Sequence, residues 1–273
     1  MDDEHDEREE RERANWLVRG LGTAGRGVAA GGVWLGRKAA AGYRAVDPDV
    51  QRHLLQLPLL AHSLFERRDA AIAPVPDDGH PPLVFVHGLG GTRGNFLLMS
   101  WWFWLNGRKR SYRIGFGPDS SIAEQAAELA RQVERVCAVN DAPVVDLVAH
   151  SLGGVVARLA LQEHGLAPRV GCFVSLGVPH HGTYPARYAN TDTLRALRPD
   201  SPLMRRLDAG RPPAGVRLIC CASRNDLFVL PPESALLEGA TAIDLTPATH
   251  YSYLLDPAAF AAVRSALDSG AGG

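Results

Sequence analysis

A serine and two glycines interrupt the apolar segment 145–161, VDLVAHSLGGVVARLAL. The residues before Ser151 have the continuous apolarity of a buried strand, and the residues after it have the period of a helix. Gly153 and Gly154 permit a sharp turn between the two elements, with the serine at its apex. Such a turn presents the Ser151 hydroxyl at the carboxyl edge of a sheet, and the backbone N–H of Leu152 points into the same space from a helix N-terminus. A nucleophile beside an oxyanion site requires this arrangement.

The residues around the serine, AHSLG at 149–153, resemble the G-x-S-x-G elbow of the α/β-hydrolase superfamily, and within it the serine lipases and esterases. Alanine replaces the first glycine, as in some bacterial lipases of this fold. Two further segments are similar to this branch. VFVHGLGGT at 84–92 looks like its His-Gly segment, and SLGVPHHGT at 175–183 looks like the S-x-G-x-P-H-x-G-T segment of triacylglycerol-lipase-like and GPI-inositol-deacylase-like proteins.

The resemblance covers about residues 82–267 and implies an α/β fold with a mainly parallel central sheet and helices on both faces. It also implies that the residue after the His-Gly pair, Leu89, supplies a second backbone N–H to the oxyanion, beside that of Leu152. The glycines of this segment let its backbone approach a reacting carbonyl closely.

Activating a serine at neutral pH needs a base, and orienting the base needs an acid. In this superfamily both follow the serine, with the acid first. His250 lies after the last predicted strand and before the last predicted helix, where a loop can bring an imidazole over the sheet edge. We therefore predict that His250 is the base. Of the other histidines after Ser151, His164 is expected in a helix, and His180 and His181 are expected to shape a loop.

The acid is predicted to be Asp226, which lies in the loop after the apolar strand 216–223. Asp244, inside the alternating strand 241–246, is the rival. His150 directly precedes the serine, and because consecutive residues point apart it is a poor base.

The resemblance implies a two-step acyl transfer from an ester. In the first step, His250 takes the proton of Ser151 as the serine attacks the carbonyl, and water repeats the sequence in the second. Asp226 fixes the imidazole tautomer. The sequence has no metal-ligand spacing and no dinucleotide glycine signature, so we expect neither a metal nor another cofactor.

The segment FLLMSWWFWL at 96–105 is unusually apolar and follows the His-Gly segment closely. Either core packing explains it, or Phe96, Trp101 and Trp102 are substrate-binding residues in the wall of an acyl pocket. The insertion 184–213 carries six arginines and a predicted helix with an apolar face. It is predicted to be a helical cap; a lid over the site, a solvated arginine face and a contact with anionic head groups all remain open for it.

Short apolar runs alternate with helical patterns through the main part of the chain. Strands are expected at 83–88, 112–117, 144–150, 170–177, 216–223 and 241–246, and helices at 95–107, 121–139, 152–165 and 256–269. This alternation predicts a parallel sheet that is covered on both faces. In the insertion, SPLMRRLDAG predicts a helix that is capped by Ser201 and ended by Gly210.

Charge is distributed unevenly along the chain. Residues 1–13 hold eight acids against three arginines, which predicts an acidic, disordered tail. The Gly- and Ala-rich segment 14–73 is predicted to be a helical appendage of the hydrolase domain 82–268, with a peripheral membrane contact through 14–42 as the alternative. Residues 269–273 are predicted to be a flexible tail. No basic stripe interleaves with aromatic residues, so nucleic acid is not an expected partner.

The four cysteines all lie in apolar runs, where reduced thiols are expected, and no signal peptide is visible. These features predict a cytoplasmic protein, with association to a membrane surface as the alternative. The sequence as a whole favours a serine hydrolase of carboxylic esters, with an ester or lipid of apolar acyl part as its small-molecule partner. A catalytically silent hydrolase-fold protein that binds lipid or a protein partner is the rival, and amide or polyester bonds are the alternative substrates.

Overall fold

The computed structural model describes residues 56, 71–117, 119–188 and 190–269. The predicted acidic tail, most of the predicted appendage and residues 270–273 of the predicted C-terminal tail lie outside the described residues.

One six-stranded sheet forms the centre of the molecule, with the strand order β2-β1-β3-β4-β5-β6 and every neighbouring pair parallel. The strands are β1 Leu83–Val86, β2 Ser111–Ile114, β3 Val145–His150, β4 Val170–Leu176, β5 Arg217–Ala222 and β6 Thr241–Asp244. Each coincides with a predicted strand to within three residues at either end. The predicted fold class is therefore confirmed.

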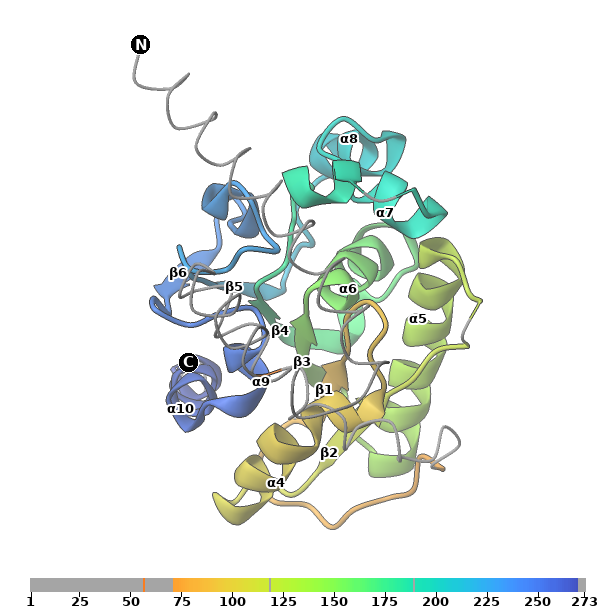
Figure 1. Cartoon of the computed structure of the whole chain (residues 1–273). Helices are drawn as coiled ribbons and strands as arrows, with labels where there is room; N and C mark the ends of the chain where they lie inside the picture. The colour runs from red at the N-terminus through yellow and green to blue at the C-terminus, as the bar shows by residue number, and fades with distance from the viewer. Residues whose placement is uncertain (1–55, 57–70, 118, 189, 270–273) are drawn as a thin grey trace, which may run out of the picture.

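Helices cover both faces of this sheet. In the described part of the chain the helices are α4 Leu97–Leu105, α5 Ile122–Asn140, α6 Leu152–Glu163, α7 Asp192–Ala196, α8 Pro202–Ala209, α9 Ser252–Leu255 and α10 Pro257–Asp268, with 3₁₀ turns η2 Arg93–Phe96, η3 Ala167–Arg169, η4 Tyr184–Tyr188 and η5 Pro232–Ala235. Figure 1 shows α5 and α6 on one side of the sheet and α4, α9 and α10 on the other. The short α9 was not predicted. Among the described helices, none is both long and apolar enough to cross a bilayer.

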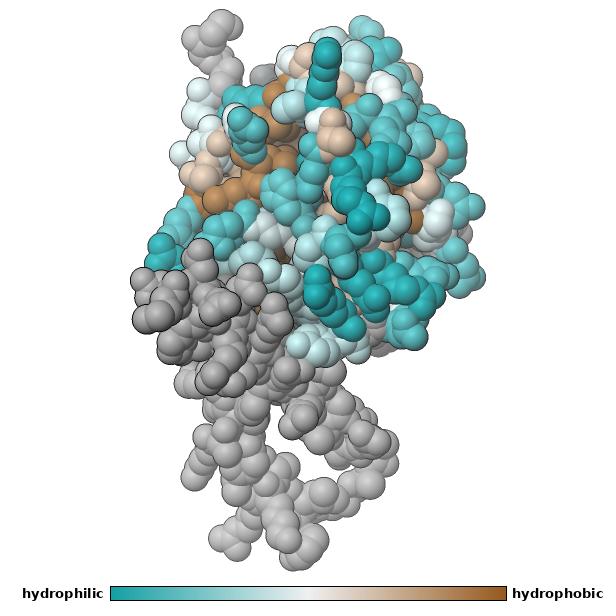
Figure 2. Space-filling view, turned by 90° about the horizontal axis from the view of Figure 1, so that it is seen from above, coloured by the Kyte–Doolittle hydropathy of each residue, from teal (hydrophilic) through white to brown (hydrophobic). Residues whose placement is uncertain are grey.

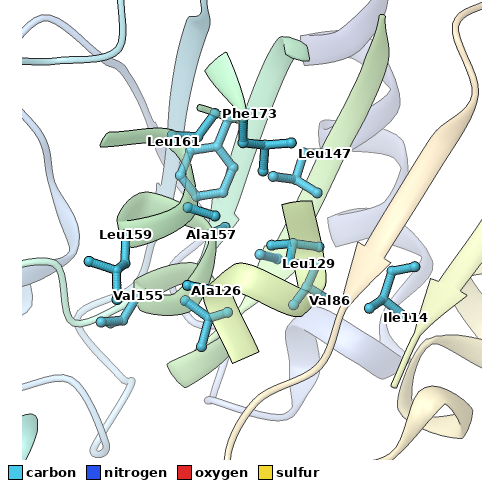
Figure 3. Packing of buried hydrophobic residues seen from close by; sticks show 14 of the residues in the cluster. Val86, Ile114, Ala126, Leu129, Leu147, Val155, Ala157, Leu159, Leu161 and Phe173 are labelled. Carbon is cyan, nitrogen blue, oxygen red and sulfur yellow. The ribbon is translucent and has the colours of Figure 1, made fainter. Parts of the chain in front are cut away.

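The strands bury both of their faces, in agreement with their continuous apolarity. In β1, Val84 and Val86 join the cluster formed with α5 and α6, whereas Leu83 and Phe85 join the cluster formed with α4 and α10. Figure 3 shows the packing of the first of these clusters. Each fully buried side chain of this size contributes about 1.5–3 kcal/mol relative to exposure. This burial on both faces holds the strand ends, and the loops that follow them, in fixed positions.

Asp146, near the amino end of β3, belongs to a buried ion pair. Asp146 accepts a hydrogen bond from Arg108 at 2.6 Å, and both side chains are less than a tenth exposed. Arg108 also donates to the carbonyl of Pro81. Burial raises the pKa of Asp146, and the hydrogen bond from Arg108 opposes that rise. The ion pair links Arg108, in the segment after α4, to Asp146 at the amino end of β3.

The predicted helix of the insertion is α8. The Ser201 side chain accepts the N–H of Met204, and α8 buries Met204 and Leu207 completely. Arg158 of α6 donates to the carbonyl of Leu207 and to Asp208, which ties α8 to α6. Figure 2 views the molecule from the side of α7 and α8 and shows mainly hydrophilic residues there, with a hydrophobic patch beside them. The exposed arginines of the insertion are Arg187, Arg195, Arg205, Arg206 and Arg211.

Candidate active site

Ser151 stands between a strand and a helix with no intervening loop. β3 ends at His150 and α6 begins at Leu152, so the serine alone makes the turn. Its backbone has φ 55° and ψ −130°, a conformation that residues with a Cβ rarely adopt. The surrounding backbone holds this strained turn, because Ser151 N–H donates to the carbonyl of Leu176 and Gly154 N–H donates to the carbonyl of Ser151. The sharp bend predicted from the sequence is present.

The two glycines after the serine allow the first turn of α6 to approach neighbouring backbone very closely. A Cβ on Gly153 would lie 2.3 Å from the carbonyl oxygen of His87, at the end of β1. A Cβ on Gly154 would lie 2.1 Å from a methyl group of Val178, just after β4. Only glycine fits either position without displacement of its neighbours.

The two predicted oxyanion residues are next in sequence to residues of the serine turn. A Cβ on Gly88 would lie 2.8 Å from the Cβ of Ser151, so the His-Gly segment packs directly against the serine, and Leu89 is the next residue. Leu152 is the first residue of α6, and its N–H has no acceptor within the helix. Leu89 is 51% exposed and Leu152 is buried. Because a leucine side chain has no hydrogen-bond donor, the predicted donors are the backbone N–H groups of these two residues.

His250 and Asp226 form a buried hydrogen-bonded pair. His250 Nδ1 lies 2.8 Å from Oδ2 and 3.0 Å from Oδ1 of Asp226, and the residues are 4% and 1% exposed. The carboxylate also accepts the N–H of Phe228 at 2.9 Å. Because Nδ1 faces a carboxylate, it carries the proton, which leaves Nε2 as a proton acceptor. Asp244 is exposed and accepts the N–H of Thr246 instead, so the structure places Asp226, and not its rival, against the imidazole.

His150 joins the serine turn to the loop that carries His250. Its Nε2 lies 2.8 Å from the backbone carbonyl oxygen of His250, and the two rings are 4.5 Å apart between centroids. Burial, and after it the neighbouring His250, lower the pKa of His150 well below its usual value. The ring is therefore neutral and donates through Nε2–H. The sequence argument that His150 is a poor base took no account of this contact, which brings the neighbour of Ser151 and the backbone of His250 to the same edge of the sheet.

Aromatic side chains enclose the imidazole, and sequence reasoning missed them. The ring of Phe228 lies 4.9 Å from that of His250, and Tyr251 makes an edge contact at 5.6 Å. Tyr253 is fully buried, and burial, reinforced by the charge of Asp226, raises its pKa well above the ordinary value. Its phenol therefore stays protonated beside the carboxylate. The two tyrosines that follow His250 in TPATHYSYLLDP were the available signal.

The three predicted substrate-binding residues occupy different environments. Phe96 is buried and stacks on Phe85 with 4.9 Å between ring centroids, which agrees with the core-packing alternative for that residue. Trp102 is partly buried against Phe260, whereas Trp101 is 59% exposed. A role of these three in binding an acyl chain stays a prediction.

The two histidines of the segment 175–183 hold its loop. His180 is fully buried and its Nε2 contacts the hydroxyl of Ser175 at 3.0 Å. His181 contacts Asp208 through Nδ1 and the carbonyl of Leu236 through Nε2. Within the described part of the chain, no group of three or more His, Cys, Asp or Glu side chains is placed to hold a metal ion.

Known proteins resemble this chain in sequence and in fold. A family model for palmitoyl protein thioesterase matches residues 82–207. A triacylglycerol lipase of Pseudarthrobacter phenanthrenivorans is 28% identical over 111 residues, which cover 37% of this chain and 34% of that relative. The chain thus matches about a third of that relative's length.

Two solved structures share the fold. The mature lipase BlEst2 of Bacillus licheniformis has 22% sequence identity and a TM-score of 0.62, over 73% of this chain and 96% of that one. Lipase B of Aspergillus fumigatus has 20% identity and a TM-score of 0.60, over 70% of this chain and 53% of that one. At these identities the likeness is one of backbone architecture.

Proposed function

We propose that this chain, which has the α/β-hydrolase fold, is a serine hydrolase that cleaves carboxylic esters through an acyl-enzyme. One observation carries the proposal: a buried carboxylate–imidazole pair, Asp226 and His250, is tied by His150 to the strained turn that presents Ser151. Backbone strain of this kind persists only where the surrounding structure maintains it, and it concentrates at active sites.

Each residue then has a defined task. His250 Nε2 accepts the Ser151 proton as the hydroxyl oxygen attacks the ester carbonyl, and it returns that proton to the leaving alcohol. The N–H groups of Leu89 and Leu152 donate to the oxyanion. Asp226 keeps the Nδ1 proton in place and stabilises the imidazolium. Water then attacks the acyl-enzyme by the same route and releases the acid.

An ester with an apolar acyl part is the proposed substrate. The triacylglycerol lipase match, and the lipase names of the two structures, agree with this class. The match to the palmitoyl protein thioesterase model also agrees with an apolar acyl chain. The bond in that family's name is a thioester, whose leaving group is a thiol in place of an alcohol. Paired oxygen esters and thioesters of one acyl chain therefore belong in the first substrate panel.

The first experiment is labelling with a fluorophosphonate probe, which reacts with activated serines. Wild type should be labelled and Ser151→Ala should not. Ser120→Ala is the matched control, because Ser120 is a partly exposed serine whose hydroxyl bonds locally to the carbonyl of Gly117, and it should label as wild type does. Asp226→Asn should lower kcat for a nitrophenyl ester by about 10⁴-fold, since the amide favours the wrong imidazole tautomer.

Labelling or hydrolysis that survives Ser151→Ala would overturn the mechanism. A wild-type protein that takes no label and cleaves no ester would instead favour the silent hydrolase-fold protein. Nitrophenyl esters from acetyl to long acyl chains then test the apolar acyl part, and a preference for acetyl would refute it.

A further inference from the structure

The turn that carries His250 is held by a residue from outside the hydrolase-like part of the chain. Gln56 Nε2 donates to Ser252 Oγ at 3.0 Å, and Thr249 Oγ1 donates to Gln56 Oε1. The sequence separation of these contacts is 196 and 193 residues. Thr249 and Ser252 flank His250, and both are buried. The single amide of Gln56 therefore forms hydrogen bonds to both ends of the turn.

With the Gln56 amide oriented as in the structure, the donor of each hydrogen bond in this cluster can be assigned. Ser252 Oγ accepts the Thr249 N–H at 3.0 Å as well as the Gln56 Nε2–H. Because the Thr249 hydroxyl gives its proton to Gln56, the contact of 3.0 Å between the two hydroxyls uses the proton of Ser252. Each hydroxyl thus donates once and accepts from its neighbours. A side chain at position 56 must supply one donor and one acceptor at amide spacing, which glutamine does.

We propose that Gln56 is a positioning residue for the base: it fixes the turn 249–252 so that the His250 imidazole reaches Ser151. This inference rests on the proposed function of that pair. It places Gln56 in the active-site architecture. Asp226 then orients the His250 ring, His150 holds the His250 carbonyl, and Gln56 holds the two residues that flank it.

A hydrogen-bonded turn matters here because proton transfer requires the imidazole within about 3 Å of the serine oxygen. A displacement of about 1 Å caused by a change away from the reacting atoms can cost about 100-fold in rate. Substrate binding does not involve this turn in the proposal, so a loosened turn should lower kcat and leave KM nearly unchanged.

The test compares Gln56→Ala with Gln132→Ala, both measured on the full chain. Gln132 is also partly buried and its amide also makes two hydrogen bonds, to the carbonyl of Gly115 and to Glu128, but it lies on α5. Gln56→Ala should lower kcat by about 10- to 100-fold with KM within about twofold, and Gln132→Ala should change neither. Gln56→Met, which keeps the length of the side chain without its hydrogen bonds, should behave as Gln56→Ala and serves if the alanine variant folds poorly.

A second background separates positioning from a general loss of stability. In Thr249→Val one of the two partners of Gln56 is already removed, so Gln56→Ala should lower kcat by a smaller factor there than it does in the wild-type background. Full additivity of the two changes would contradict action through the turn, as would a wild-type kcat in Gln56→Ala.

Hydrogen exchange gives a readout that does not depend on activity. Exchange of the Thr249 amide, which donates to Ser252 Oγ, should accelerate at least tenfold in Gln56→Ala and not in Gln132→Ala. Unchanged exchange at residues 249–252 would overturn the inference even in an inactive protein. If exchange accelerates in Gln56→Ala but the wild-type protein hydrolyses no ester, Gln56 does hold the turn and the proposed function is refuted.

Discussion

Replacing Gly153 by alanine should damage both the stability and the reactivity of the protein, because the added methyl group meets backbone. Its Cβ would lie 2.3 Å from the carbonyl oxygen of His87 and 2.7 Å from that of Val86. An ordinary contact is 3.4 Å or longer, so β1 and α6 must separate by about 1 Å. Both carbonyls belong to the backbone that leads from β1 into the His-Gly segment, so a shift of either would move that segment.

The expected cost follows from this geometry. Overpacking of a rigid site costs about 1–3 kcal/mol, and a clash with backbone places Gly153→Ala at the upper end, about 3 kcal/mol. The better helix propensity of alanine offsets at most about 1 kcal/mol of it. Because the separation moves the proposed donor Leu89 away from Ser151, kcat should fall about 100-fold as well.

Urea unfolding and ester hydrolysis measure the two effects on the same preparations. Gly171→Ala is the matched control, because a Cβ there meets nothing closer than 3.5 Å, and it should be neutral in both assays. Gly154→Ala meets the Val178 side chain rather than backbone, so Val178→Ala should restore part of its lost stability. A Gly153→Ala protein as stable and as active as wild type would refute the close approach of α6 to β1.

Two further predictions concern buried charge and pH. Arg108→Leu leaves Asp146 buried without its partner and should reduce the free energy of unfolding by about 3–5 kcal/mol at pH 7. This penalty should shrink as pH falls and the carboxylate takes a proton; a penalty independent of pH in urea unfolding would contradict the account. Burial lowers the pKa of His180 well below 6.5, so below pH 6.5 the unfolded chain binds a proton that the folded chain does not, and stability is lost as pH falls. The slope is about 1.4 kcal/mol per pH unit for this histidine, and His180→Gln should remove it from the stability profile; an unchanged profile would show that His180 titrates normally.

The sequence by itself was sufficient for the strand order along the chain, the sharp turn at Ser151 and the choice of His250 as the candidate base. The first two depend on neighbours in sequence, namely the hydrophobic period and the small residues at a turn. The third rests on the order of acid and histidine that the resemblance to the α/β-hydrolases implies. Asp226 was preferred to Asp244 because of its place in the loop after the strand. In the structure Asp226 contacts His250 Nδ1 and Asp244 is exposed, and the role of Asp226 as the acid stays a prediction.

Only the tertiary structure decided which distant residues support the site. Nothing local in the sequence indicates that His150 bonds to the His250 carbonyl 100 residues away, or that Gln56 bonds to residues 249 and 252. Phe96 was similarly ambiguous, because an apolar helix next to an active site has the same composition whether it lines a pocket or fills a core. Hydrophobic periodicity and turn-forming residues act over a few positions, so their effect can be predicted from the sequence. Contacts between remote segments depend on how the packed sheet and helices bring their ends together, and that is settled only by the folded chain.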